Sequence, residues 1–406
     1  NLSDYLVGPI LVDIDRSSGS DGAKETYRID LSRAEIRLDF IGWRKAQGIP
    51  ATARMRVTSN AKGMRIEDFV LEGDGFGAAG AVELTPKGEI KKLLLKEFAL
   101  RSGDLLQIEA VLHAENTYDV SVTGQAFDAR SLINVLTETP TGNVEEAVPS
   151  SFRYQIKASI DTITGYLNET VSNFVLDVTM RGSTVLRIKV DGNTQGSKEP
   201  FAIAYGSRDK RGDVLSANGP DGGAIARFLN IYYRAFGGPF TIEAERPPGG
   251  RAMRGNFKMT DFNLVDEPAL KGLSAGNRDA EGRSSVGFDI LDIDFIEEGN
   301  KLTTTKGLLS GESIGGTYEG VLNRRTKQVD LTGTYVPAYV LNNFITKIPL
   351  LGLALGNGQR EGLIGVTFKV TGTLGKPQVT VNPLSALAPG FLRQFFRFKK
   401  AQGQTN

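Results

Sequence analysis

The chain has 406 residues, a formal net charge of +1, 40% hydrophobic residues, 48 glycines, no cysteine and one histidine. Without cysteine it has no disulfide framework, thiolate zinc site or thiol nucleophile, and one histidine excludes metal sites built from several histidines. The glycine content and modest hydrophobicity indicate many short strands with frequent turns. We expect neither a metal nor a cofactor.

The first residues, NLSDYLVGPI, contain neither an initiator methionine nor a signal-peptide pattern. We therefore expect a mature form or a fragment. From Tyr27 to Phe40 apolar and charged residues alternate, which predicts one half-buried antiparallel strand with Ile36, Leu38 and Phe40 on the same face.

Similar alternation or short apolar runs, bounded by Gly, Pro, Asp or Asn, predict further strands along the chain. They are 51–57, 106–112, 152–160, 174–180, 186–190, 201–205, 291–295 and 329–335. With ordinary strand and turn lengths the chain holds roughly 18 to 22 strands.

The segment Gly75–Gly80 matches GxGxxG, the dinucleotide-binding pattern. A dinucleotide site needs a helix N-terminus after the glycines, whereas AVEL follows here and predicts another strand. We interpret the segment as a turn or bulge. His113 ends the strand 106–112 on the face opposite Leu106, which favours a solvent-facing residue over a catalytic one.

Short helices are predicted where an Asp precedes an apolar repeat, because its carboxylate can accept from the first free N–H groups of a helix. Asp128, Asp221 and Asp266 are such residues, and they predict helices at 129–138, 221–236 and 266–273. The polar segment 139–150 and the segment 275–285 are the expected boundaries. This gives three segments, 1–140, 151–275 and 285–406.

The densest acidic run is Asp289, Asp292, Asp294, Glu297 and Glu298. Its spacing is not that of a calcium loop, and alternation with apolar residues predicts the outer face of a strand. A carboxylate pair assembled from distant strands stays open, so an all-β carbohydrate-active enzyme is a weaker alternative.

The C-terminal region is apolar and basic. Two helices are expected, at 338–347 and 383–398, and Lys347 and Pro349 argue against a membrane-spanning helix. After Glu361 there are six cations and no acidic residue. This pattern is typical either of a helix lying on an anionic membrane or of one docked on the sheet with its cations in water. Without a recognised binding module, nucleic acid is not expected as a partner. The residues expected to contact a membrane are Leu350, Leu351, Phe391, Leu392, Phe395, Phe396, Arg393, Arg397, Lys399 and Lys400.

The segments VPAYVLNNFITKIPLLG at 336–352 and VTVNPLSALAPGFLR at 379–393 resemble the C-terminal region of the AsmA-like family, which includes the YhdP- and TamB-related proteins of Gram-negative bacteria. The resemblance continues more loosely at 124–132, 221–232 and 262–270. It implies an elongated, curved antiparallel β-groove built from strands plus a short helix. It also implies a periplasmic location, with an inner-membrane anchor supplied by an N-terminal segment absent from this chain.

Periodicity alone favours an ordinary β-sandwich, whereas the resemblance favours an open groove. The implied function is bridge-like transport of phospholipid between the inner and outer membranes, with acyl chains shielded in the groove. A scaffold or assembly factor for outer-membrane proteins, with outer-membrane or periplasmic protein partners, is the alternative. Shared strand parity assigns ten residues to the groove: Ile36, Leu38, Phe40, Leu106, Ile108, Phe174, Leu176, Leu291, Ile293 and Phe295.

Overall fold

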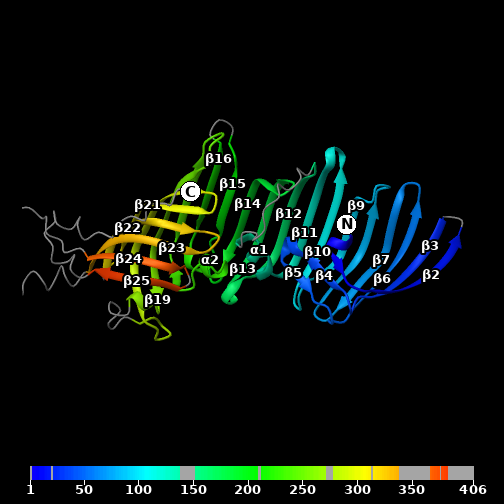
Figure 1. Ribbon diagram of the computed structural model, residues 1–406, viewed down its shortest axis with the longest axis horizontal. Coiled ribbons are helices and arrows are strands. Elements are labelled where there is room, and N and C mark those ends of the chain that lie inside the picture. Colours follow the sequence, from blue (N-terminus) through cyan, green and yellow to red (C-terminus); the bar gives the residue numbers. More distant parts are fainter. Residues whose placement is uncertain are drawn as a thin grey trace, which may run out of the picture. The chain divides into compact units, whose positions relative to one another are not determined.

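The structure, a computed structural model, is mainly β, as predicted, and most of its strands are antiparallel (Figure 1). It describes residues 2–19, 22–137, 151–208, 212–270, 278–311, 314–337, 366–374 and 376–382. Two compact units, Asn1–Gly206 and Ser207–Asn406, make up the chain. Their border lies inside the expected segment 151–275, and the three-segment division stays a prediction.

Unit 1 contains a large sheet in which each strand pairs with the next along the chain, apart from the insertion between β3 and β6. Its strands are β2 (Leu11–Gly19), β3 (Gly22–Asp30), β6 (Ala51–Asn60), β7 (Gly63–Gly73), β8 (Phe76–Leu84), β9 (Ile90–Ala99), β10 (Leu105–His113), β11 (Thr117–Asp128), β12 (Arg153–Thr164), β13 (Thr170–Arg181), β14 (Thr184–Thr194) and β15 (Phe201–Ser207).

One pair of this sheet departs from the antiparallel pattern. Strands β11 and β12 are parallel, with Thr117 opposite Arg153 and Asp128 opposite Thr164. Parallel neighbours need a crossover, and the helix α1 (Arg130–Thr137) follows β11 directly. Short 3₁₀ segments occur at η3 (Ala114–Asn116) and η4 (Tyr166–Asn168).

The insertion between β3 and β6 forms a separate three-stranded sheet together with the strand β1 (Leu6–Val7), which precedes β2. It consists of β4 (Glu35–Leu38), which pairs with β1 and β5 (Trp43–Lys45), and it is accompanied by η1 (Leu2–Asp4) and η2 (Asp39–Ile41). The expected single strand 27–40 is therefore wrong. The chain leaves the large sheet at Asp30, whose carboxylate accepts from the Ser32 N–H at 2.8 Å and starts a turn.

Unit 2 likewise contains antiparallel sheet strands and one helix, α2 (Gly222–Phe228). Its strands are β16 (Asp213–Gly219), β17 (Ala235–Gly237), β18 (Phe240–Arg246), β19 (Met253–Val265), β20 (Ser285–Glu298), β21 (Lys301–Ser310), β22 (Ile314–Asn323), β23 (Gln328–Pro337), β24 (Val366–Thr373) and β25 (Lys376–Asn382). β16 pairs with β18, β17 and β18 pair with β19, and the order then follows the chain to β25.

The expected helices fall as follows. The helix expected at 129–138 is α1, and the one expected at 221–236 is the shorter α2, capped by Asp221, whose carboxylate accepts from the Ala224 N–H at 2.7 Å. At 266–273 the structure has the 3₁₀ turn η6 (Pro268–Leu270). The helices expected at 338–347 and 383–398 lie outside the described residues.

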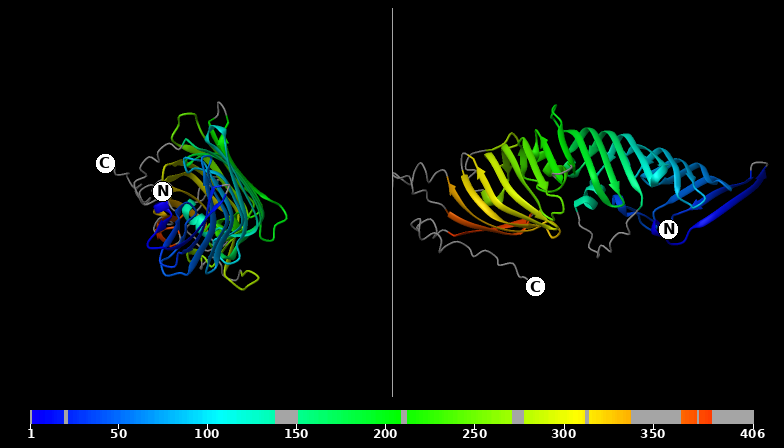
Figure 2. Two further views of the ribbon diagram at one scale, coloured as in Figure 1. Left: turned by 90° about the vertical axis from the view of Figure 1, so that its right-hand side faces the viewer. Right: turned by 90° about the horizontal axis from the view of Figure 1, so that it is seen from above.

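Each large sheet is curved, so each has a concave and a convex face (Figure 2). Among the described pairings β2 has β3 as its only neighbour and β25 has β24 as its only neighbour, so the strands do not close into a barrel. In unit 1 the small sheet, dark blue, and α1, teal, lie on the concave side (Figure 2).

Candidate apolar binding face

One face of the unit 1 sheet is apolar from β6 to β15. Residues directly opposite on neighbouring strands point to the same face, so the pairing register traces that face across the sheet. Ile108 lies opposite Leu95 on one side and Val122 on the other. The same row continues through Ala158, Leu176, Val190 and Ile203. We call this surface the apolar face of unit 1.

The opposite face of the unit 1 sheet is charged. Glu109, next to Ile108, forms an ion pair with Lys92 at 3.0 Å, and Arg187 forms one with Asp177 at 3.0 Å. Burial follows this division along β12, where Ala158 and Ile160 are buried while Lys157 is exposed. The sheet therefore separates an apolar side from a water-facing side.

Part of the apolar face of unit 1 is covered by the small sheet. The Trp43 ring meets the Phe76 ring edge-on with centroids 5.1 Å apart, and the Trp43 Nε1–H donates to the Leu100 carbonyl at 2.7 Å. Leu31 is buried with Ala51 and Ala53, which lie at the start of β6. The covered part thus lies at the strand ends that include Ala51 and Phe76.

Helix α1 extends this cover along the same strand ends. The Ala129 N–H donates to the Thr164 carbonyl at the end of β12, and the Ile133 side chain is buried. Asp104 is 5% exposed, and its carboxylate accepts from the N–H groups of Leu100, Arg101 and Asp128 at 3.0, 2.9 and 2.8 Å. This carboxylate joins the β9–β10 turn to the start of the helix.

The middle and opposite ends of the strands have no such cover among the described elements. Leu106 and Ile160, near the covered ends, are each 5% exposed. Ile108, Val122 and Ile156, farther along the same strands, are only half-buried. A half-buried apolar strip therefore crosses the unit 1 sheet from β6 to β15, and these ten strands at about 4.8 Å spacing make it about 40 Å long.

Unit 2 has an apolar face of its own. Ile293 lies opposite Phe257 and Gly307, and Leu291 lies opposite Met259 and Leu309. The face extends through Leu331, Val370 and Val379 to β25. Asp292 and Asp294 point to the other face, where both carboxylates accept from the Asn256 side-chain amide, at 2.6 and 2.9 Å. This confirms the outward position predicted for the two aspartates.

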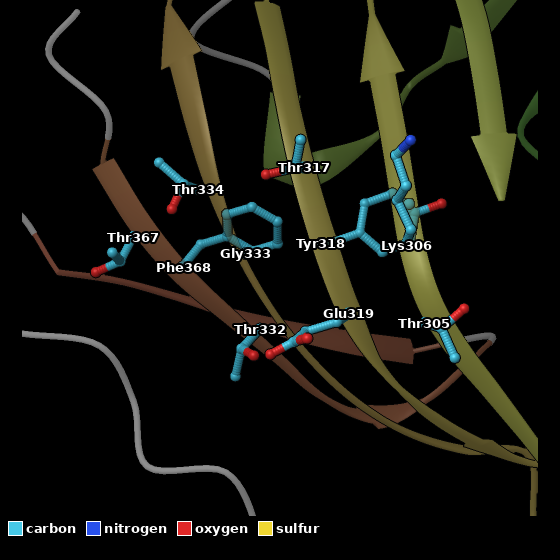
Figure 3. Close-up of a pocket in the computed structure, with 11 residues that line it drawn as sticks. Thr305, Lys306, Thr317, Tyr318, Glu319, Thr332, Gly333, Thr334, Thr367 and Phe368 are labelled. Carbon is cyan, nitrogen blue, oxygen red and sulfur yellow. The ribbon is translucent and has the colours of Figure 1, made fainter. Parts of the chain in front are cut away.

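Glycines alternate with aromatic rings in one row of the unit 2 apolar face. Gly307 is opposite Tyr318, Tyr318 is opposite Gly333, and Gly333 is opposite Phe368 (Figure 3). A Cβ at Gly307 would be 2.5 Å from the Tyr318 ring, and one at Gly333 would be 2.6 Å from the Phe368 ring. The rings therefore lie flat over the glycines. Burial raises the pKa of the Tyr318 hydroxyl, with the charge of Asp292 adding to the effect.

A shallow depression of about 310 Å³ lies at these strands (Figure 3). By register, Thr317, Thr334 and Thr367 are opposite one another on the polar face, as are Glu319 and Thr332. Another depression, of about 790 Å³, lies over β7 to β11 in unit 1. Both are lined by hydroxyl, amide or charged side chains as well as by backbone.

Helix α2 covers one end of the unit 2 apolar face. Gly222 lies against Met259 and Phe240, so that a Cβ there would be 3.2 Å from the Met259 Sδ. Arg227 in this helix is buried, donates to the Ala235 carbonyl and stacks on the Phe236 ring at 4.1 Å. Each unit thus has a helix packed on its own apolar face.

Seven of the ten residues predicted for the groove lie on these apolar faces. Leu106, Ile108, Phe174 and Leu176 share the face of unit 1, and Leu291, Ile293 and Phe295 share that of unit 2. Ile36, Leu38 and Phe40 do not lie on either large sheet: the first two are in β4, and Phe40 is in η2 with 65% of its surface exposed. The prediction failed for these three residues because the chain turns after Asp30 and enters the small sheet. The apolar residues before and after this turn keep the same odd–even alternation, so the sequence pattern does not reveal it.

Sequence reasoning missed the residues of the cover. Trp43, Lys45 and Asp104 are buried and tie separate elements together, yet each stands in a polar or mixed context. The Lys45 Nζ donates to the carbonyls of Leu31 and Ala34 at 2.8 and 2.7 Å, and burial lowers its pKa. The one feature of the sequence that could have indicated this cover is Trp43, the only tryptophan of the chain, two residues before Lys45. The residues expected to contact a membrane, from Leu350 to Lys400, lie outside the described residues.

The glycine-rich segment and the single histidine can be placed in the described part of the chain. Gly75 has a φ of 79° and turns directly into β8, which is a strand as predicted. His113 points to the polar face, where its Nε2 is 3.0 Å from the Asp119 carboxylate. Among the residues that the structure describes, no group of three or more His, Asp or Glu could hold a metal ion. None of the described helices has the length and hydropathy needed to span a membrane.

No protein-family model, curated protein or solved structure matches the chain. The apolar faces and their covers are therefore the basis for assigning a function.

Proposed function

We propose that the chain binds phospholipid acyl chains on its apolar faces and carries phospholipid between two membranes of the cell envelope, as a periplasmic protein of the AsmA-like kind. The observation that carries the proposal is the half-buried apolar strip of unit 1, which crosses every strand from β6 to β15 and which the described elements cover along one set of strand ends only. Exposed apolar surface of this extent marks an interaction site in a soluble protein.

The physical role of such a face is to replace the membrane interior. Each acyl CH₂ kept out of water contributes about 0.8 kcal/mol, so two long chains lose tens of kcal/mol in water. A row of Ile, Val, Leu and Ala side chains removes that barrier without covalent chemistry. The proposed activity is therefore transport and not catalysis.

A test of the proposal places charge on the apolar face. In Ile108→Asp the carboxylate would point where acyl chains lie, at a high desolvation cost, and we expect lipid binding and transfer to fall at least about tenfold. Ser121→Asp is the matched control, because Ser121 is exposed on the polar face of the neighbouring strand. Binding is measured by native mass spectrometry of the folded chain, and transfer between two vesicle populations by a fluorescent phospholipid.

Equal lipid binding and transfer by the parent chain and a folded Ile108→Asp would contradict the proposal. A role as a scaffold for outer-membrane proteins would survive that result, since it requires no lipid on the sheet. Phe174→Asp, on β13 of the same face, provides a second variant should Ile108→Asp fail to fold.

A further inference from the structure

The turns at the uncovered strand ends of each unit are rich in cations. In unit 2 these turns connect β18 to β19, β20 to β21, β22 to β23 and β24 to β25. Register places them on one edge, since Met253 is opposite Glu297, Lys301 is opposite Asn323 and Gln328 is opposite Thr373. We call this edge the open rim of unit 2. Helix α2 packs at the other strand ends, near Phe240.

Five exposed cations on the open rim of unit 2 form no ion pair with a described residue. Two others are neutralised, because Arg246 pairs with Asp213 at 2.8 Å and Arg324 with Glu297 at 2.6 Å. Glu298 is the remaining acid of these turns. The five are Arg251, Lys301, Arg325, Lys327 and Lys376.

Unit 1 shows the same charge pattern independently. Its open rim, the edge opposite the small sheet and α1, carries the exposed cations Lys62, Lys87, Arg153 and Arg181, again without an ion pair among the described residues. The acids in the described turns of this rim are Glu89 and Glu115. The covered edge has more acids than cations: its turns and strand ends carry Asp30, Asp74, Asp104, Asp128, Glu169 and Glu199 against Arg33, Arg101, Arg130 and Lys198, and Arg101 and Arg130 are both paired with Asp128.

Aromatic side chains lie between the apolar face and the open rim of unit 1. Tyr118 and Tyr154 are opposite each other at the starts of β11 and β12, with rings stacked at 5.6 Å, and Phe152 lies 5.4 Å from Tyr118. The Tyr118 hydroxyl donates to the Ile90 carbonyl at 2.8 Å. Aromatic rings with a polar end occupy the same level in membranes, where hydrocarbon meets headgroup.

We infer that a lipid held on either apolar face directs its phosphate-bearing headgroup to the open rim, where the rim cations bind the phosphate. This rests on the proposed function and adds the orientation of the lipid and the residues that fix it. The described rows of the apolar faces offer no cation to a phosphate, and in unit 1 the covered edge offers a helix and more acids than cations. Phosphate oxygens are strong acceptors for Lys and Arg donors.

The test compares three variants of the full chain, all with Gln in place of a cation. The unit 2 rim variant changes the five cations Arg251, Lys301, Arg325, Lys327 and Lys376, and the unit 1 rim variant changes Lys62, Lys87, Arg153 and Arg181. The control changes five exposed cations of the polar faces that also make no ion pair with a described residue: Arg54, Lys157, Lys189, Arg254 and Lys258. The probes are phosphatidylglycerol and diacylglycerol, which share acyl chains and differ in the phosphate headgroup, with inorganic phosphate as competitor.

We expect the parent and the control to prefer phosphatidylglycerol to diacylglycerol in native mass spectrometry. Each rim variant should show this preference reduced about tenfold, while its binding of diacylglycerol stays unchanged.

Rim variants that keep the preference of the parent overturn the inference and leave the proposed function standing. A control that loses as much as the rim variants also overturns it, since net charge alone then explains the preference. A parent that binds neither lipid refutes the proposed function itself. If the rim cations recognise the phosphate, millimolar inorganic phosphate should reduce the preference for phosphatidylglycerol. It should not release the acyl chains from the apolar face.

Discussion

At the scale of single residues, the glycines of the unit 2 apolar face have a packing role. A side chain at Gly333 would collide with its neighbours, because the added Cβ would lie 2.3 Å from the Thr317 carbonyl oxygen and 2.6 Å from the Phe368 ring. We expect Gly333→Ala to lower the free energy of unfolding by about 1–3 kcal/mol in chemical denaturation followed by circular dichroism. Gly315→Ala is the control, since a Cβ there meets nothing closer than 3.8 Å. Equal stability of the two variants would contradict the close packing of Thr317 and Phe368 on Gly333.

Lys45 is a second residue whose effect can be measured, because its amine is buried under carbonyls. Lys45→Met leaves the carbonyls of Leu31 and Ala34 without a donor, and we expect a loss of about 2 kcal/mol. Burial lowers the pKa of the amine below 10.5, so the unfolded chain holds the proton more tightly. Native stability of the parent therefore rises with pH between the lowered pKa and 10.5, and this contribution is absent from the variant.

The measurement for Lys45 is denaturant unfolding of parent and variant, followed by the emission of Trp43, the one tryptophan of the chain. Trp43 neighbours Lys45 on the small sheet, so its emission reports on this region. The gap in stability between parent and variant should widen as the pH rises toward 10.5, the pKa of the amine in the unfolded chain. A gap that narrows over this range would show that the amine is not desolvated in the folded protein.

At the scale of elements, alternation was enough to predict most strands and their apolar sides. Leu106, Ile108, Ala110 and Leu112 alternate with polar or charged residues over most of β10, and both the strand and the face follow from that pattern. Alternation could not show where a strand changes sheet, because the turn after Asp30 preserves the parity of Ile36 and Leu38. Nor could it show bulges such as the one at Asp68, whose φ of 49° shifts the register between β7 and β8.

The cover of unit 1 offers a prediction at this scale. The Asp104 carboxylate accepts from three N–H groups, two in the β9–β10 turn and one at the end of β11. An asparagine at this position cannot keep all three bonds. We therefore expect Asp104→Asn to lower the free energy of unfolding by about 2 kcal/mol. It should also expose Trp43, since the Leu100 carbonyl that accepts from the indole belongs to the same turn. Asp74→Asn, in the exposed neighbouring turn, is the control. If the Trp43 emission spectrum of Asp104→Asn is unchanged, Asp104 in the β9–β10 turn does not hold the small sheet in place.

At the scale of the whole chain, function depends on which residues share an edge, and this requires the strand register. Lys62, Lys87, Arg153 and Arg181 are far apart in sequence, and only the pairing of β6 through β14 puts them on one rim. The sequence showed an apolar side and scattered cations, while the common edge came from the fold. The resemblance to the AsmA-like family supplied the expectation of a groove, and the curved sheets agree with it.

Lipid binding should raise the stability of the folded chain. A lipid that binds the folded apolar faces and not the unfolded chain adds about 2.7 kcal/mol at a free concentration of one hundred times Kd. For units of this size that corresponds to an increase in Tm of about 5–10 °C. The measurement compares the delipidated chain with the lipid-saturated chain by circular dichroism, while Trp43 emission reports on unit 1 alone.

The matched variants Ile108→Asp and Ser121→Asp test whether this stabilisation comes from lipid on the apolar face. Ile108→Asp should lose the lipid-dependent increase in the Tm of unit 1, and Ser121→Asp should keep it. If saturating lipid leaves Tm unchanged in the parent chain, the apolar faces are not lipid-binding surfaces and a protein partner must cover them.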